Sequence, residues 1–282
     1  MNGNGGAGFR TDDGQFLSVN NFGYIDENGK IISSIHGFQK TDGTSGGVIA
    51  ADGTNSGSKF TIHDSVFSNN NVSGSGANGG VININLSSGI ITNSNFVNNS
   101  SEHWGGVVAV GTDSSLTVLN SHFSGNSAEM AGAIFFYGDK LSRVFGSTFT
   151  SNTAKAGGSI YFGELGWVNG STFTGNTATG GSDVSAYGGA IDSDGMLFVS
   201  DSIFSQNGKS TYGGAISSGQ YLVVSGSSFD GNTASNRGSA ISADGKAVIY
   251  NSVFENNVNS YDGGTIGHTG TFSMALVGSV FN

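Results

Sequence analysis

The chain has 282 residues with 10 Lys and Arg against 20 Asp and Glu, a net charge of −10, and it contains 49 Gly but no Pro and no Cys. Without Cys there is no disulfide scaffold, zinc finger or thiolate chemistry, and with so few basic residues a nucleic-acid-binding surface is not expected. No apolar run is long enough for a transmembrane helix and the N-terminus lacks a signal-peptide core, so we expect no membrane insertion of this segment and an export signal outside this chain.

Residues 1–45 match the rest of the chain poorly, although residues 30–38 look like a degenerate first repeat. We interpret residues 1–45 as an N-terminal cap, because the end of a repeat array has to cover an open sheet edge. Residues 46–282 are expected to form one repeat domain, whose C-terminus ends within a repeat.

A single Phe defines the repeat and returns about every 27 residues, nine times between Phe67 and Phe281. Ser stands two residues before every copy, an aliphatic residue five before, and Asp, Asn or Gly three before. Asn stands three residues after Phe in all eight copies in which that position exists. Asp, Asn and Gly tolerate a positive φ, so the position three before Phe predicts a corner of the chain.

A second block, Gly-Gly-x-Ile, opens the other half of the repeat, as in Gly188–Ile191 and Gly213–Ile216. Between these blocks lie short runs that alternate with period two, and helical spacing is absent. A repeat of this length with about three short strands predicts an all-β fold, a right-handed parallel β-helix of about 9–10 coils. Phe and Ile should point inward and stack on their equivalents, and the Asn side chains should bond along the axis.

The paired motifs resemble the repeats of the chlamydial polymorphic outer membrane proteins, most clearly where Gly188–Ile191 is followed by Phe204–Asn207 and Gly213–Ile216 by Phe229–Asn232. The resemblance extends from about residue 46 to residue 282. It implies a pectin-lyase-like β-helix in an exported, autotransporter-like passenger that acts in adhesion at the bacterial cell surface, associated with the outer membrane.

Several aromatic residues are candidates for ligand binding. Trp104, Tyr187 and Tyr212 each precede a Gly pair, and Tyr261 lies one position further back, so they are expected to form a ridge along one corner. Phe135 and its equivalent in the next coil, Tyr161, follow the inward Ile and should face outward as a small apolar patch. Aromatic surfaces suit sugar rings and protein partners alike.

The densest acidic cluster is Asp192 with Asp194, followed by Asp201 and preceded by Asp183, and Asp192 and Asp194 are the candidate metal ligands. The Arg and His residues share no repeat position, so we identify no catalytic set and expect neither an enzyme nor a bound cofactor. The insertions at residues 50–58, 71–78 and 177–187 are the first candidates for recognition loops.

These patterns favour an adhesin segment that binds a glycan or protein of the cell surface or matrix. The first alternative is a structural spacer or fibre segment that stacks end to end on neighbouring β-helix segments, because the chain stops inside a repeat. The second is a polysaccharide lyase or hydrolase, for which Asp192 and Asp194 are the only candidate acids.

Overall fold

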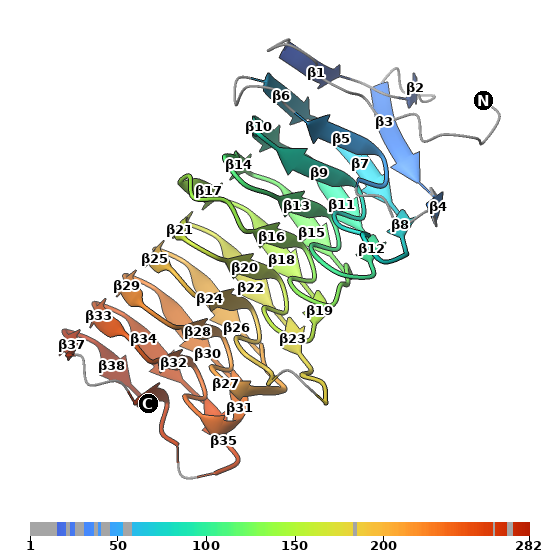
Figure 1. The fold of residues 1–282 in the computed structure, drawn as a ribbon. Helices are drawn as coiled ribbons and strands as arrows, with labels where there is room; N and C mark the ends of the chain where they lie inside the picture. The colour runs from blue at the N-terminus through green and yellow to red at the C-terminus, as the bar shows by residue number, and fades with distance from the viewer. Residues whose placement is uncertain are drawn as a thin grey trace.

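The computed structural model describes residues 46–52, 58–182, 185–261, 263–269 and 273–282, and the backbone of four strands nearer the N-terminus. These four are β1 (Phe16–Asn20), β2 (Gly23–Ile25), β3 (Ile31–His36) and β4 (Gln39–Lys40). Every regular element among the described residues is a strand, and the chain winds into a right-handed parallel β-helix (Figure 1). The predicted fold class is confirmed.

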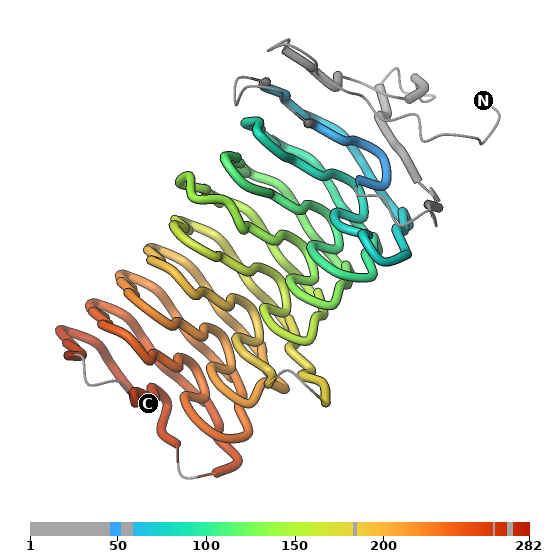
Figure 2. The backbone as a smooth tube through the Cα atoms, in the orientation of Figure 1, coloured from blue at the N-terminus to red at the C-terminus, as the bar shows by residue number. Residues whose placement is uncertain are grey.

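Each coil contributes one strand to each of three long sheets, and the described coils stack in register along the axis (Figure 2). Sheet 1 contains β1, β6 (Ser58–His63), β10 (Ser87–Thr92), β14 (Ser115–Leu119), β17 (Ser142–Phe145), β21 (Leu165–Asn169), β25 (Met196–Ser200), β29 (Tyr221–Ser225), β33 (Lys246–Tyr250) and β37 (Met274–Val277). Sheet 2 contains β2, β3, β7 (Ser65–Ser68), β11 (Asn95–Val97), β15 (His122–Ser124), β18 (Thr148–Thr150), β22 (Thr172–Thr174), β26 (Ile203–Ser205), β30 (Ser228–Asp230), β34 (Val253–Glu255) and β38 (Val280–Phe281).

Sheet 3 contains β5 (Ile49–Asp52), β9 (Ile82–Asn85), β13 (Val108–Val110), β16 (Ile134–Phe136), β20 (Ile160–Phe162), β24 (Ile191–Ser193), β28 (Ile216–Ser218), β32 (Ile241–Ala243) and β36 (Ile266–His268). Its nine strands bound about eight turns within the described residues, slightly fewer than the 9–10 coils that the sequence predicted. Short strands mark the remaining corner: β4, β8 (Asn71–Val72) and β12 (Ser100–Ser101); β19 (Thr153–Ala154) and β23 (Thr177–Ala178); β27 (Ser210–Tyr212), β31 (Thr233–Arg237) and β35 (Val258–Asn259).

The repeated Phe forms a continuous stack inside the coils. Phe96 pairs in register with Phe67 and Phe123, and the ring centroids of Phe96 and Phe123 are 4.8 Å apart, the spacing of adjacent parallel strands. The equivalent rings from Phe67 to Phe254 are buried. Burying each ring stabilises the fold by about 1.5–3 kcal/mol, and the stack belongs to one hydrophobic core together with the buried Ile, Val and Leu side chains.

The repeated Asn forms a second internal ladder. Asn152 Nδ2 donates to Oδ1 of Asn176 in the next coil at 3.1 Å and to the carbonyl oxygen of Phe123 in the preceding coil at 3.0 Å. Asn176 Oδ1 also accepts the backbone N–H of Asn152 at 3.0 Å. Each amide therefore satisfies buried backbone groups at a turn, which confirms the predicted bonding along the axis.

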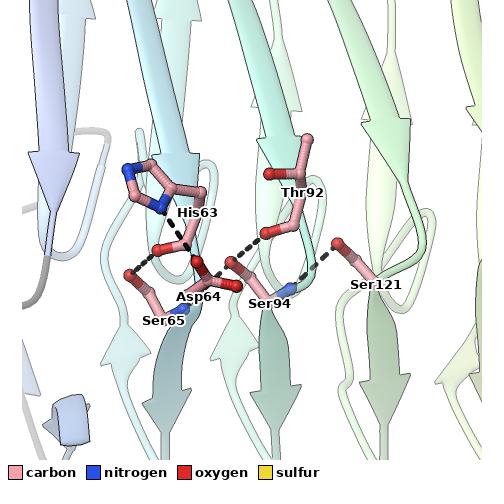
Figure 3. Close-up of polar contacts among 6 residues, drawn as sticks. All are labelled: His63, Asp64, Ser65, Thr92, Ser94 and Ser121. Atoms are coloured by element: carbon pink, nitrogen blue, oxygen red, sulfur yellow. Dashed lines mark hydrogen bonds and ion pairs between the residues drawn. The ribbon is translucent and has the colours of Figure 1, made fainter. Parts of the chain in front are cut away.

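The Ser that precedes each Phe fixes the corner between sheets 1 and 2 (Figure 3). Ser94 Oγ donates to the carbonyl oxygen of Thr92 at 2.8 Å, and the backbone N–H of Ser94 donates to Ser121 Oγ at 3.1 Å. The residue before this Ser has a positive φ, 49° at Asp64 and 48° at Asn93, as predicted for this position.

The Gly pair forms the entry to sheet 3. The first Gly has a positive φ, 66° at Gly79, and Ala131 holds the same conformation at 58°. A Cβ on the second Gly would meet the next coil, at 2.3 Å from the carbonyl oxygen of Gly158 in the case of Gly132. The pair therefore gives both the bend and the close approach that its sequence indicates.

The interpretation of residues 1–45 as a cap stays a prediction, since most of them lie outside the described residues. Within that segment β3 pairs in parallel with β7, and its Ile35 aligns with Phe67.

Candidate ligand-binding groove

The outer face of sheet 3 carries a groove. Figure 1 shows the sheet from this side. The middle residue of each strand points away from the core, yet it is buried because a row of residues stands on either side. We call the middle residues the floor: Asn83, Ala109, Phe135, Tyr161, Asp192, Ser217 and Ser242. The residues before the Gly pairs are the wall: Asn78, Trp104, Met130, Ala156, Tyr187, Tyr212 and Arg237. The residues that follow the strands are the rim: Asn85, Thr112, Asp113, Tyr137, Asp139, Glu164, Asp194, Gln220 and Asp244.

Four aromatic side chains converge at the N-terminal half of this groove. The ring of Trp104 stacks on Phe135 with centroids 5.0 Å apart, and Phe135 stacks on Tyr161 at 4.8 Å. Tyr137 completes the cluster, 6.3 Å from Phe135 and 6.5 Å from Trp104. Trp104 is 41% exposed and Tyr137 55% exposed, so their rings are open to a ligand.

Phe135 and Tyr161 do point away from the core, but the expected exposed patch is wrong. Their exposed fractions are 4% and 8%, because they pack with Ala131 and Met130 in a small second hydrophobic cluster and Trp104 covers Phe135. Phe135 therefore packs against the exposed rings of Trp104 and Tyr137.

The residues of the expected aromatic ridge do lie in one row, but the row is not aromatic throughout. Trp104, Tyr187 and Tyr212 share the wall, with Met130 and Ala156 between the first two. Tyr187 stacks on Tyr212 at 5.3 Å, which forms a second, separate aromatic pair. Tyr261 is 76% exposed and no ring contact joins it to either group among the described residues.

The rim is acidic. Asp113, Asp139, Glu164 and Asp194 follow sheet 3 in successive coils and line, with Tyr137 and Tyr161, a hollow of about 530 Å³. A neighbouring hollow of about 170 Å³ lies between Trp104, Phe135 and Tyr137. The two hollows share Thr112 and Tyr137, so they form one groove along several coils.

Asp192 and Asp194 have different surroundings although both are in this groove. Asp192 is 7% exposed, and burial together with the negative charge of Asp194 raises its pKa to about 7. Asp194 is exposed and accepts a hydrogen bond of 2.6 Å from the Tyr161 hydroxyl. Burial and this bond to a carboxylate raise the pKa of Tyr161 above its ordinary value, so Tyr161 stays a donor.

The predicted acidic cluster is only partly assembled. Asp201 lies at the corner between β25 and β26, with φ 50°, and accepts a hydrogen bond from Asn169 at 3.2 Å, whereas Asp183 lies outside the described residues. Within the described ranges, no three His, Asp or Glu side chains are grouped as a metal ion would require.

Two of the predicted recognition loops border the groove. Residues 71–78 and the described parts of 177–187 lie at the corner of the short strands, and each loop ends on a wall residue, Asn78 and Tyr187. Part of the insertion at 50–58 lies outside the described residues.

Sequence reasoning missed Tyr137, Asp139, Glu164 and Arg237, because it compared only the residues that recur. Counting from the inward Ile of each coil places Tyr137, Asp139 and Glu164 three, five and four residues after it, so all three follow a strand of sheet 3 and a signal was present. Sequence reasoning also missed an apolar hollow of about 420 Å³ on the outer face of sheet 1. It is lined by Leu141, Leu165, Trp167, Phe198, Val199, Ser200, Val223, Ser225 and Tyr250. Its central residues precede the inward aliphatic residue of each repeat and therefore face outward.

Fold and groove together define a β-helix repeat protein with an open surface groove. Two segments of the chain, residues 170–194 and 226–244, match the model of the Chlamydia polymorphic membrane protein repeat. Comparison with curated proteins and with solved structures gives no significant match. Across the described ranges we find no helical segment with the length and hydrophobicity that a membrane span needs.

Proposed function

We propose that this chain is a surface-displayed β-helix segment of an autotransporter-like passenger, and that it binds a cell-surface or matrix partner, a glycan or a protein, along the groove of sheet 3. The match of two segments to a polymorphic membrane protein repeat supports display at the bacterial cell surface. The proposal depends above all on one observation, the exposed rings of Trp104 and Tyr137 held over the buried floor residue Phe135.

Binding is favoured over catalysis by the state of the candidate acids. Asp192 is a buried residue of the groove floor and Asp194 accepts a hydrogen bond from the Tyr161 hydroxyl, whereas a glycosidase needs two carboxyl groups in contact with the scissile bond. An open groove along stacked coils instead offers a long contact surface, as repeat proteins commonly use for partners.

The test compares two tryptophans of equal exposure. Trp104 and Trp167 are both 41% exposed, but Trp104 lies in the groove and Trp167 on sheet 1. The purified chain, Trp104→Ala and Trp167→Ala are screened against a glycan array and against immobilised matrix and cell-surface proteins. We expect binding that Trp104→Ala removes and Trp167→Ala retains.

Equal binding by both variants would contradict the proposed site. Turnover of a polysaccharide by the wild-type chain, lost in Asp192→Asn, would replace the proposal with the hydrolase alternative.

A further inference from the structure

At the C-terminal end of the groove, the guanidinium of Arg237 lies across the groove itself. Arg237 is a wall residue, and its guanidinium carbon lies 4.9 Å from the ring centroid of Tyr212, the preceding wall residue. Its Nη2 donates to Oδ1 of the rim residue Asp244 at 2.6 Å, and its Nε donates to Oγ of the floor residue Ser242 at 3.1 Å. One guanidinium thus contacts wall, floor and rim at once.

The coils towards the N-terminus also have wall, floor and rim residues, but among the described residues no arginine of the chain itself lies across them. Asp139 and Glu164 are exposed rim carboxylates with no ion pair among the described residues. The carboxylate of Asp113 lies 3.7 Å from Lys140 Nζ, which itself donates to the backbone carbonyl oxygen of Asp113 at 2.6 Å.

Aromatic rings accompany these carboxylates. Tyr137 lines the larger hollow together with Asp113 and Asp139, and Trp104 lines the smaller hollow together with Tyr137. An aromatic face beside a carboxylate is the surrounding that a guanidinium prefers, because its plane stacks on the ring while its N–H groups bond to the carboxylate.

We propose that the groove binds arginine side chains of a basic segment of a partner protein, each held as Arg237 is held within the chain. This rests on the proposed function and names the chemistry of its partner. The net charge of −10 assists the approach of such a segment, while the aromatic faces and the positions of the rim carboxylates select arginine over other cations.

The experiment measures the affinity of the full chain for a synthetic peptide with arginine at alternate positions, and for the same peptide with citrulline at those positions. Citrulline keeps the shape of the side chain and removes its charge. We expect binding of the arginine peptide, weakened by added salt, and binding of the citrulline peptide weaker by about tenfold or more.

The matched variants are Asp139→Asn/Glu164→Gln in the rim and Asp230→Asn/Glu255→Gln on sheet 2, which remove the same charge from another face. Asp230 and Glu255 pair with each other on the adjacent strands β30 and β34. The control variant therefore changes the net charge by the same amount as the rim variant and leaves the groove residues unchanged. The rim variant is expected to lose about tenfold in affinity and the control less than about twofold.

Equal losses in the two variants would reduce the effect to overall charge and overturn the inference, as would an absence of peptide binding or equal binding of the citrulline peptide. A neutral oligosaccharide that binds through Trp104 while the arginine peptide does not would overturn the inference and leave the proposed function standing.

Discussion

The side-chain amide of Asn126 donates to Oδ1 of Asn152 in the next coil at 3.0 Å, and the same oxygen accepts the backbone N–H of Asn126, also at 3.0 Å. One buried side chain therefore satisfies two donors of another coil. Asn152 donates to Asn176 in the same way, so the ladder continues from each coil to the next.

Asn152→Ala is expected to lower the free energy of unfolding by about 3 kcal/mol, because it leaves buried donors of Asn126 without an acceptor. Chemical denaturation followed by circular dichroism measures this change. Thr150→Ala, which alters an outward-facing side chain of the same coil, should change it by less than about 0.5 kcal/mol. Similar values for the two variants would contradict the role of the ladder.

Gly166→Ala is expected to destabilise the chain by about 1–3 kcal/mol, because a Cβ at this position would lie 2.5 Å from Cδ1 of Phe162 across the core. Phe162→Leu alone should also be destabilising. In the double variant the smaller Leu leaves room for the new methyl group, so we expect a loss smaller than the sum of the two. A double-mutant cycle of unfolding free energies measures this coupling, and strict additivity would show that the two residues do not compete for space.

Asp192 should make stability fall as the pH rises. Its pKa is raised to about 7 in the folded chain from an ordinary value near 3.8, so its stabilising contribution is complete below about pH 4 and is lost as the pH rises through about 7. Asp192→Asn removes this charge, and we expect the variant to be more stable than the wild type at pH 8 by about 1–3 kcal/mol.

The measurement is the difference in unfolding free energy between wild type and Asp192→Asn from pH 4 to pH 8, which isolates this group from the other titrating residues. Asp230→Asn is the control, because Asp230 is exposed and lies on sheet 2 rather than beside Asp192. A pH-independent difference for Asp192→Asn would contradict the raised pKa.

Arg237→Gln should extend the groove by one site. The substitution removes the guanidinium from between Tyr212 and Asp244, so we expect the arginine peptide to bind about two- to fivefold more tightly than it binds the wild type. Isothermal titration calorimetry with that peptide checks the change. Unchanged affinity would show that Arg237 does not occupy a position that the ligand can use.

The sequence alone determined the β-helix, because a stacked coil imposes the same environment on every equivalent position and so repeats its residue types. Phe67 to Phe281, the Asn ladder and the positive φ at Asp64 and Asn93 could all be predicted from recurrence. Recurrence also placed Trp104, Tyr187 and Tyr212 in one row.

Only the tertiary structure decided what that row faces. Alternation correctly directs Phe135 and Tyr161 away from the core, but burial depends on what the preceding coil and the flanking corners place over them, here Met130 and the ring of Trp104. Asp139, Glu164 and Arg237 do not share one repeat position, and their meaning comes from the residues that they face across the groove. The core repeats because its environment repeats, whereas the outer surface varies from coil to coil and becomes a site only where unlike residues meet in space.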